Sequence, residues 1–288
     1  MKKNWLKIFT VITSLLFTSC YGSWNIFYDG NNVDCRSKEM LCLDDETDSV
    51  FAESGISSLT GSYNVLIITD SHFGYKFKEA PLECLYNWLD SVKGTAAAPE
   101  FAICLGDAVD TGCQAEYDEY LDFCQNLKSL YGIKIVFNTC GNHDIYQSHW
   151  GNWQKNCYPH SSFYSFKTSS FSWYSFDTGD GTLGTKQYDI LRKAIENDPS
   201  PKIVFSHYPL TEYRLAFGLG DTTERNLLIK LFLQNKVCCY FGGHDHCCNY
   251  KDIGLKDYCC PSFRFNEAWT ILHIDEENGK AVAEFIGD

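Results

Sequence analysis

Short, continuously apolar runs recur along the chain from about residue 61 and alternate with amphipathic stretches. The runs span residues 65–69, 101–105, 133–137, 202–206 and 237–241. Runs of this length without polar alternation are typical of strands that are buried on both faces. The stretches at 81–92, 115–131, 185–196 and 225–235 space their apolar residues as one helical face requires. Two hairpins are expected, at 162–177 and 268–286. This alternation predicts an α/β domain with helices on both faces of a sheet.

The first sixty residues follow a different pattern. Lys2, Lys3 and Lys7 precede an apolar stretch at 8–17, which is the layout of a signal peptide and is too short to span a bilayer. The stretch that ends in Cys20 resembles a bacterial lipoprotein signal, which implies export, lipidation of Cys20 and membrane attachment at a periplasmic or cell-surface location. Plain signal cleavage and an amphipathic N-terminal helix are the alternatives. Residues 21–60 lack periodicity and carry an acidic run, so we predict a tether and entry segment. The expected organisation is therefore 1–20 signal, 21–60 tether and 61–288 catalytic domain.

Charge and cysteine content narrow the function further. The chain has 24 Lys and Arg against 37 Asp and Glu, a net charge of −13, which argues against binding to duplex nucleic acid. It has 15 cysteines but no C-x-x-C pair. Neighbouring cysteines in a strand point to opposite faces, so we expect no disulfide within an adjacent pair. The pairs are Cys238-Cys239, Cys247-Cys248 and Cys259-Cys260. We interpret the cysteines as small buried apolar residues mixed with a few disulfides.

Polar side chains follow every one of the five apolar runs. In chain order they are Asp70-Ser71-His72, Gly106-Asp107, Gly141-Asn142-His143-Asp144, the single His207, and Gly243-His244-Asp245-His246. Ligands of open α/β sheets bind outside the carboxyl ends of the strands. We therefore expect these side chains to meet at one edge of one sheet.

Carboxylate, amide and imidazole groups in this combination suit Mn, Fe or Zn. Asp107 follows a central strand and a glycine, which makes it the candidate to bridge two ions. Two ions ~3.5–4 Å apart can hold a hydroxide and neutralise the attacking and leaving oxygens of an in-line displacement. The sequence therefore predicts a dinuclear hydrolytic centre.

The ordered blocks D-x-H, G-D, G-N-H-D, H and G-H-x-H, over roughly residues 63–250, resemble those of the calcineurin-like metallophosphoesterases. The resemblance implies a two-layered β-sandwich flanked by helices and a metal-dependent phosphoric ester hydrolase. It implies one ion held by Asp70, His72, Asp107 and His246, and another held by Asp107, Asn142, His207 and His244. His143 would contact the phosphate and assist the leaving group, and Asp144 would hold the His143 imidazole.

Departures within the blocks point to one branch of this family. Asp110 stands where purple acid phosphatases have a tyrosine ligand, and the third block ends in Asp144 where protein Ser/Thr phosphatases have Glu. The pattern resembles the cyclic-nucleotide and general phosphodiesterase branch, which implies a small phosphoester as substrate. A phosphomonoesterase or nucleotidase with the same site, and a non-catalytic protein that binds a phosphorylated ligand, are alternatives. Tyr208 and Arg214 are candidate substrate contacts, and Cys247 and Cys248 are expected to be structural.

Overall fold

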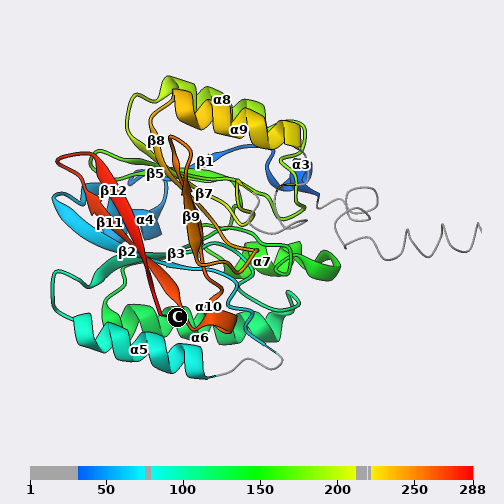
Figure 1. Cartoon of the computed structure of the whole chain (residues 1–288). Helices are drawn as coiled ribbons and strands as arrows, with labels where there is room; N and C mark the ends of the chain where they lie inside the picture. Colours follow the sequence, from blue (N-terminus) through cyan, green and yellow to red (C-terminus); the bar gives the residue numbers. More distant parts are fainter. Residues whose placement is uncertain (1–31, 75–78, 212–218, 220–221, 288) are drawn as a thin grey trace, which may run out of the picture.

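Two β-sheets pack face to face between two layers of helices (Figure 1). The computed structural model describes residues 32–74, 79–211, 219 and 222–287. The strands are β1 (Leu41–Cys42), β2 (Ser62–Ile68), β3 (Pro99–Cys104), β4 (Val136–Asn138), β5 (Tyr164–Lys167), β6 (Ser172–Ser175), β7 (Lys202–Phe205), β8 (Val237–Gly242), β9 (Asn249–Asp252), β10 (Lys256–Cys259), β11 (Trp269–Asp275) and β12 (Lys280–Ile286). The helices are α3 (Val33–Arg36), α4 (Ser49–Ser54), η1 (Ile56–Ser58), α5 (Ala80–Val92), α6 (Gln114–Tyr131), η2 (Tyr146–Ser148), α7 (Trp150–Asn156), α8 (Gln187–Asn197), α9 (Thr222–Gln234) and α10 (Phe263–Asn266).

The sheet topology confirms the α/β class and the two-layered sandwich that the resemblance implied, and it corrects the expectation of one sheet that came from the apolar runs. One sheet has the order β12-β11-β2-β3-β4, and the other has the order β1-β5-β6-β7-β8-β10-β9. The strands that precede the metal-binding blocks are therefore divided, with β2, β3 and β4 in the first sheet and β7 and β8 in the second. Each group is parallel within its sheet. The two sets of carboxyl ends converge on the same end of the sandwich, as the family resemblance implied.

Aromatic side chains fill the space between the sheets and account for much of the aromatic content. Phe137 of the first sheet stacks on Phe166 of the second with ring centroids 4.2 Å apart. Phe166 in turn stacks on Trp173, and Phe101 meets Trp173 edge-on at 5.4 Å. Offset and edge-on aromatic pairs add about 0.5–1.5 kcal/mol each beyond the area that they bury. This central core holds the two sheets, and hence the two halves of the site, in a fixed relation.

The outer faces of the sheets are covered by different helices, so each sheet has helices on one face only. Alternate residues of β2 and β3 point away from the central core and pack on α5 and α6, where Leu85 and Tyr117 are fully buried. Alternate residues of β7 and β8 pack likewise on α8 and α9, where Leu191 and Phe232 are fully buried. Burial on both sides explains why these strands read as continuous apolar runs.

Residues 33–58 belong to the folded domain, which corrects the expected tether over 21–60. β1 pairs in parallel with β5 at the edge of the second sheet. Phe51 of α4 is buried against Phe137 and Phe166 of the central core. The segment has no long periodic pattern because its elements are short and pack through single side chains. The expected signal and Cys20 lie outside the described residues. No helix in the described ranges is long and apolar enough to cross a membrane.

Candidate metal centre

The candidate ligands lie on sharp turns directly after the strands. Asp70, His72, Asp107, His244 and His246 all have positive φ, between 46° and 61°. Non-glycine residues seldom adopt this left-handed conformation, and it costs energy that the surrounding fold must offset. Five of the ten non-glycine residues with positive φ in the described part of the chain are candidate ligands, which agrees with the tendency of strained positions to cluster at functional sites.

The close approach of two of these turns requires glycine. A Cβ on Gly106 would lie 2.7 Å from the Gly141 nitrogen and 2.8 Å from His207 Nδ1. A Cβ on Gly141 would overlap the Asp107 carboxylate. These glycines therefore allow the loops after β3 and β4 to pack directly against each other.

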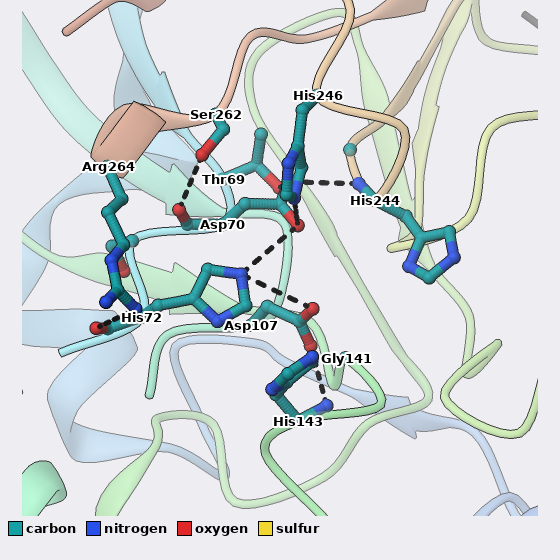
Figure 2. Close-up of polar contacts among 12 residues, drawn as sticks. Thr69, Asp70, His72, Asp107, Gly141, His143, His244, His246, Ser262 and Arg264 are labelled. Atoms are coloured by element: carbon teal, nitrogen blue, oxygen red, sulfur yellow. Dashed lines mark hydrogen bonds and ion pairs between the residues drawn. The ribbon is translucent and has the colours of Figure 1, made fainter. Parts of the chain in front are cut away.

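One cluster of ligand atoms joins the loop after β2 to the loop after β8 (Figure 2). His246 Nε2 lies 3.2 Å from Asp70 Oδ1, and His72 Nε2 lies 4.0 Å from the same oxygen. The other Asp70 oxygen accepts hydrogen bonds from the Thr69 hydroxyl and the His244 backbone N–H. Asp70 is thus held with Oδ1 facing the two imidazoles.

A second cluster surrounds His207. Its Nε2 lies 3.1 Å from Asn142 Oδ1, 3.2 Å from His244 Nδ1 and 3.3 Å from Asp107 Oδ2. Its Nδ1 is 2.9 Å from the Leu105 carbonyl oxygen. A carbonyl on the far nitrogen is the usual way to orient a metal-binding imidazole.

Asp107 Oδ2 connects the two clusters. This one oxygen lies 3.3 Å from His207 Nε2 and 3.9 Å from His72 Nε2. Within the described part of the chain, His72 Nε2 is buried and has no hydrogen-bond partner. A buried polar atom that faces two carboxylates at these distances fits a shared cation. The residues present therefore suit two metal ions bridged by Asp107.

The side chains of the candidate ligands shift one another's pKa values. Burial raises the pKa of Asp107, but the charge and hydrogen bond of His207 outweigh it and hold the pKa well below the usual range. Burial lowers the pKa of His207, but Asp107 outweighs it and raises the pKa to about 9. Burial and the neighbouring His207 lower the pKa of His244 to about 3. A protonated His207 thus supplies positive charge that a metal ion would replace.

His143 lies beside this centre, but Asp144 does not hold its ring. The His143 and His72 rings meet edge-on at 4.6 Å, and the His143 backbone N–H donates to Asp107 Oδ1. The Nδ1 atom of His143 is 2.7 Å from the Asp110 carbonyl oxygen. This contact corrects the expected role of Asp144, because its buried carboxylate accepts the backbone N–H groups of Asp107, Val109 and Gly141 instead. Asp144 joins the two metal-binding loops rather than orienting the imidazole.

The candidate substrate contacts have different outcomes. The Tyr208 ring stacks on His244 with centroids 3.9 Å apart, at the edge of the second cluster. Arg214 lies outside the described residues, so its contact with phosphate stays a prediction. Asp110 lies 3.5 Å from His72 Nδ1 through its Oδ1 atom.

Three residues around α10 belong to the site and were missed from the sequence. The Ser262 hydroxyl donates to the Asp70 carbonyl, and Arg264 pairs with Asp110 and donates to the His72 carbonyl (Figure 2). Phe265 is 61% exposed although its ring is 5.2 Å from that of His246. No motif marks these residues, because only folding brings the segment after β10 onto the β2 loop.

The chain is similar to known proteins both in structure and in sequence. By structure the chain is similar to a dimetal phosphatase from Danio rerio (TM-score 0.60, 12% identity, 78% of this chain and 96% of that one). It is also similar to GAP50, the anchor in the inner membrane complex of Plasmodium (TM-score 0.57, 14% identity, 79% and 85% of the two chains). By sequence it is 36% identical over 78 residues to an uncharacterized protein of Saccharomyces cerevisiae, a match that spans 25% of this chain and only 12% of the yeast protein. A family model of the calcineurin-like phosphoesterases matches residues 63–248. The chain therefore belongs to the calcineurin-like phosphoesterase family.

Proposed function

We propose that this protein hydrolyses a small phosphoester with a dinuclear metal centre, and that it prefers phosphodiesters to phosphomonoesters. The observation that carries the proposal is the shared position of Asp107 Oδ2 between two ligand clusters. When bound, two ions supply positive charge to the phosphate oxygens and activate water as the nucleophile. Mn, Fe and Zn all suit this mixture of oxygen and nitrogen ligands.

The residues of the chain contribute orientation and a proton. Asp70, Asp107 and Asn142 place oxygen ligands on turns that the two sheets fix. Four imidazoles on the same turns place nitrogen ligands. Burial lowers the pKa of His143, but the charge of Asp107 and the bond to the Asp110 carbonyl outweigh it and raise the pKa above its usual 6.5. A pKa shifted in this direction favours the protonated imidazole, the form that the acid protonating a leaving alcohol needs. We assign this step to Nε2, since Nδ1 is bonded to Asp110.

Two aromatic rings support a substrate with a planar group. Tyr208 borders the cluster around His207, and Phe265 borders His246 at the other side of the centre. Stacking of an aromatic ring on a planar group contributes about 1–3 kcal/mol. We therefore infer an aryl or nucleoside ester of phosphate.

The test pairs metal analysis with turnover of matched aryl phosphomonoester and phosphodiester substrates in Mn, Fe and Zn. We expect turnover that requires about two ions per chain at this centre, and a preference for the diester. Asp107→Asn should lose both metal and activity. His143→Ala should keep the metal and lose activity by about a hundred- to ten-thousandfold. His273→Gln is the control. His273 lies on β11 outside the site and bonds Asn64 of β2 and Glu284 of β12.

Four results would contradict parts of the proposed function. Full activity of Asp107→Asn would remove the bridging role, and full activity of His143→Ala would remove the acid. A monoester preference would assign the chain to the phosphomonoesterases or nucleotidases. Tight binding of phosphoesters without turnover in any of the three metals would make it a non-catalytic binding protein; a protein described as an anchor shares this fold.

A further inference from the structure

A second group of potential metal ligands lies behind the loop that carries His244 and His246. It consists of Asp245, Cys247 and Cys259, whose ligand atoms all lie within 4.8 Å of one another. Asp245 stands between two ligands of the dinuclear centre in sequence, yet its carboxylate joins this other group. Cys259 ends β10, which pairs with β8 and β9 on either side of the loop.

The geometry of this group resembles that around a small cation. Cys247 Sγ lies 3.3 Å from Asp245 Oδ2, and Cys259 Sγ lies 3.7 Å from the Gly243 carbonyl oxygen. Sulfur and oxygen ligands on one tetrahedral zinc are about 3.5–3.8 Å apart, given Zn–S of about 2.3 Å and Zn–O of about 2.1 Å. Because the ligand atoms of the three side chains all lie within 4.8 Å of one another, movements of about an ångström bring them to these separations.

The surroundings of the sulfurs also fit a bound cation. Asp245 is 2% exposed and Cys259 is fully buried, whereas Cys247 is partly exposed and leaves a route from solvent. Burial raises the pKa of the Cys259 thiol well above its usual range, and the backbone N–H of Cys247 acts in the opposite direction. Hydrogen bonds from backbone N–H groups to sulfur stabilise thiolates, and a buried carboxylate beside two sulfurs attracts positive charge.

We propose that Asp245, Cys247 and Cys259 bind a structural zinc ion, separate from the dinuclear centre. Two thiolates select zinc over the harder cations, and the fourth position is open to water on the Cys247 side. Binding releases the two thiol protons to solvent and changes no oxidation state. The ion would tie the His244–His246 loop to β10 and so hold two ligands of the catalytic centre in place.

A disulfide between the two cysteines is the competing use of the same atoms. In the β9–β10 ladder Cys259 lies opposite Asn249, two residues beyond Cys247, so the cysteines are not a directly opposed pair. The geometry therefore favours the ion.

Cobalt substitution tests the proposal, because the ligand set of the dinuclear centre contains no cysteine. Zinc-free protein reloaded with Co²⁺ should show the near-ultraviolet thiolate-to-cobalt charge-transfer band. We expect Cys247→Ser and Cys259→Ser to lose this band and one zinc per chain. Cys248→Ser is the matched control, since Cys248 is the exposed neighbour outside the group and should keep both.

Several results would overturn the proposal. Wild-type protein with no such band, a band that survives Cys247→Ser, or a Cys247–Cys259 disulfide in unreduced peptide maps would each do so. If the buried Cys259→Ser variant does not fold, the partly exposed Cys247→Ser variant and Asp245→Asn still decide the question. The readout needs no turnover, so it is independent of the proposed phosphoesterase activity.

Discussion

At the scale of single residues, the centre is organised around the charge of Asp107. Its carboxylate holds His207 protonated in the ion-free chain, raising the pKa of that imidazole to about 9 against the effect of burial. A histidine must lose this proton before Nε2 can bind a metal. Protons and metal ions therefore compete for one position.

The first prediction concerns this competition. Below about pH 9, metal binding should release one proton from His207, so affinity should fall by about tenfold for each pH unit lowered. Calorimetric titration in two buffers of different ionisation enthalpy at pH 7 and pH 8 measures the release. His207→Asn should bind more weakly and release one proton fewer. Equal affinity at both pH values would show that His207 is neutral without metal.

The second prediction concerns backbone approach at Gly141. A methyl group there would overlap the Asp107 carboxylate, so Gly141→Ala should displace the bridging ligand and lower kcat/KM by a hundredfold or more. Gly151→Ala is the control, because nothing lies within 4 Å of a Cβ at that position of α7. Kinetics of both variants with bound metal quantified check this. Similar activity in the two variants would contradict the close approach.

At the scale of elements, a buried ion pair attaches α3 to the loop between β6 and α8. Arg36 donates from Nε and Nη2 to the two oxygens of Asp177, at 2.8 and 2.9 Å, and from Nη1 to Asp180 at 3.3 Å. The Arg36 and Asp177 side chains are 1% and 0% exposed. The acidic Asp177–Asp180 turn thus binds a guanidinium, and the segment expected to be a tether supplies it.

The third prediction follows from this pair. Arg36→Met should lower the free energy of unfolding by about 3–5 kcal/mol, because Asp177 would stay buried without its partner. Burial raises the pKa of Asp177, but Arg36 outweighs it and lowers the pKa below 3.8. The contribution is therefore present above about pH 4 and is lost as pH falls through the lowered pKa. Urea unfolding at pH 7 and pH 3 measures the difference.

A double variant gives the control for this experiment. Arg36→Met with Asp177→Leu removes both charges and should recover much of the lost stability. If Arg36→Met alone is as stable as the wild type at pH 7, α3 is not held by this pair.

At the scale of the whole molecule, local and overall charge have opposite signs. The chain carries −13, but two divalent ions would bring four positive charges to a pocket whose carboxylate ligands are Asp70 and Asp107. An acidic protein can thus bind a small phosphoester while repelling the long phosphate backbone of duplex nucleic acid.

The fourth prediction concerns the location of the molecule. We propose that the chain is exported and anchored through a lipid on Cys20. The support is the basic start, the apolar stretch at 8–17 and the lipoprotein-like sequence that ends in Cys20. Cys20→Ser should move the protein from the membrane fraction to the soluble fraction, as measured by fractionation and by the intact mass of the mature N-terminus. A mature chain that begins elsewhere and carries no lipid would support plain signal cleavage.

The amino-acid sequence by itself determined the class of the fold and the chemistry of the site. The positions of the strands along the chain and the residue types that follow them are local properties. The continuous apolar runs therefore predicted the strands, and the five blocks predicted the candidate ligands. The candidate metal ligands Asp70, His72, Asp107, Asn142, His207, His244 and His246 were all named in this way. The structure brings these seven side chains together.

Only the tertiary structure decided how distant segments meet. It divided the strands between two sheets, placed Arg36 on Asp177, and gave His143 the Asp110 carbonyl in place of Asp144. It also set Phe265 beside His246 and Cys259 beside Cys247. These contacts depend on packing between elements that are far apart in sequence. Many side chains can fill such a contact, so the local pattern of residues does not predict which ones meet.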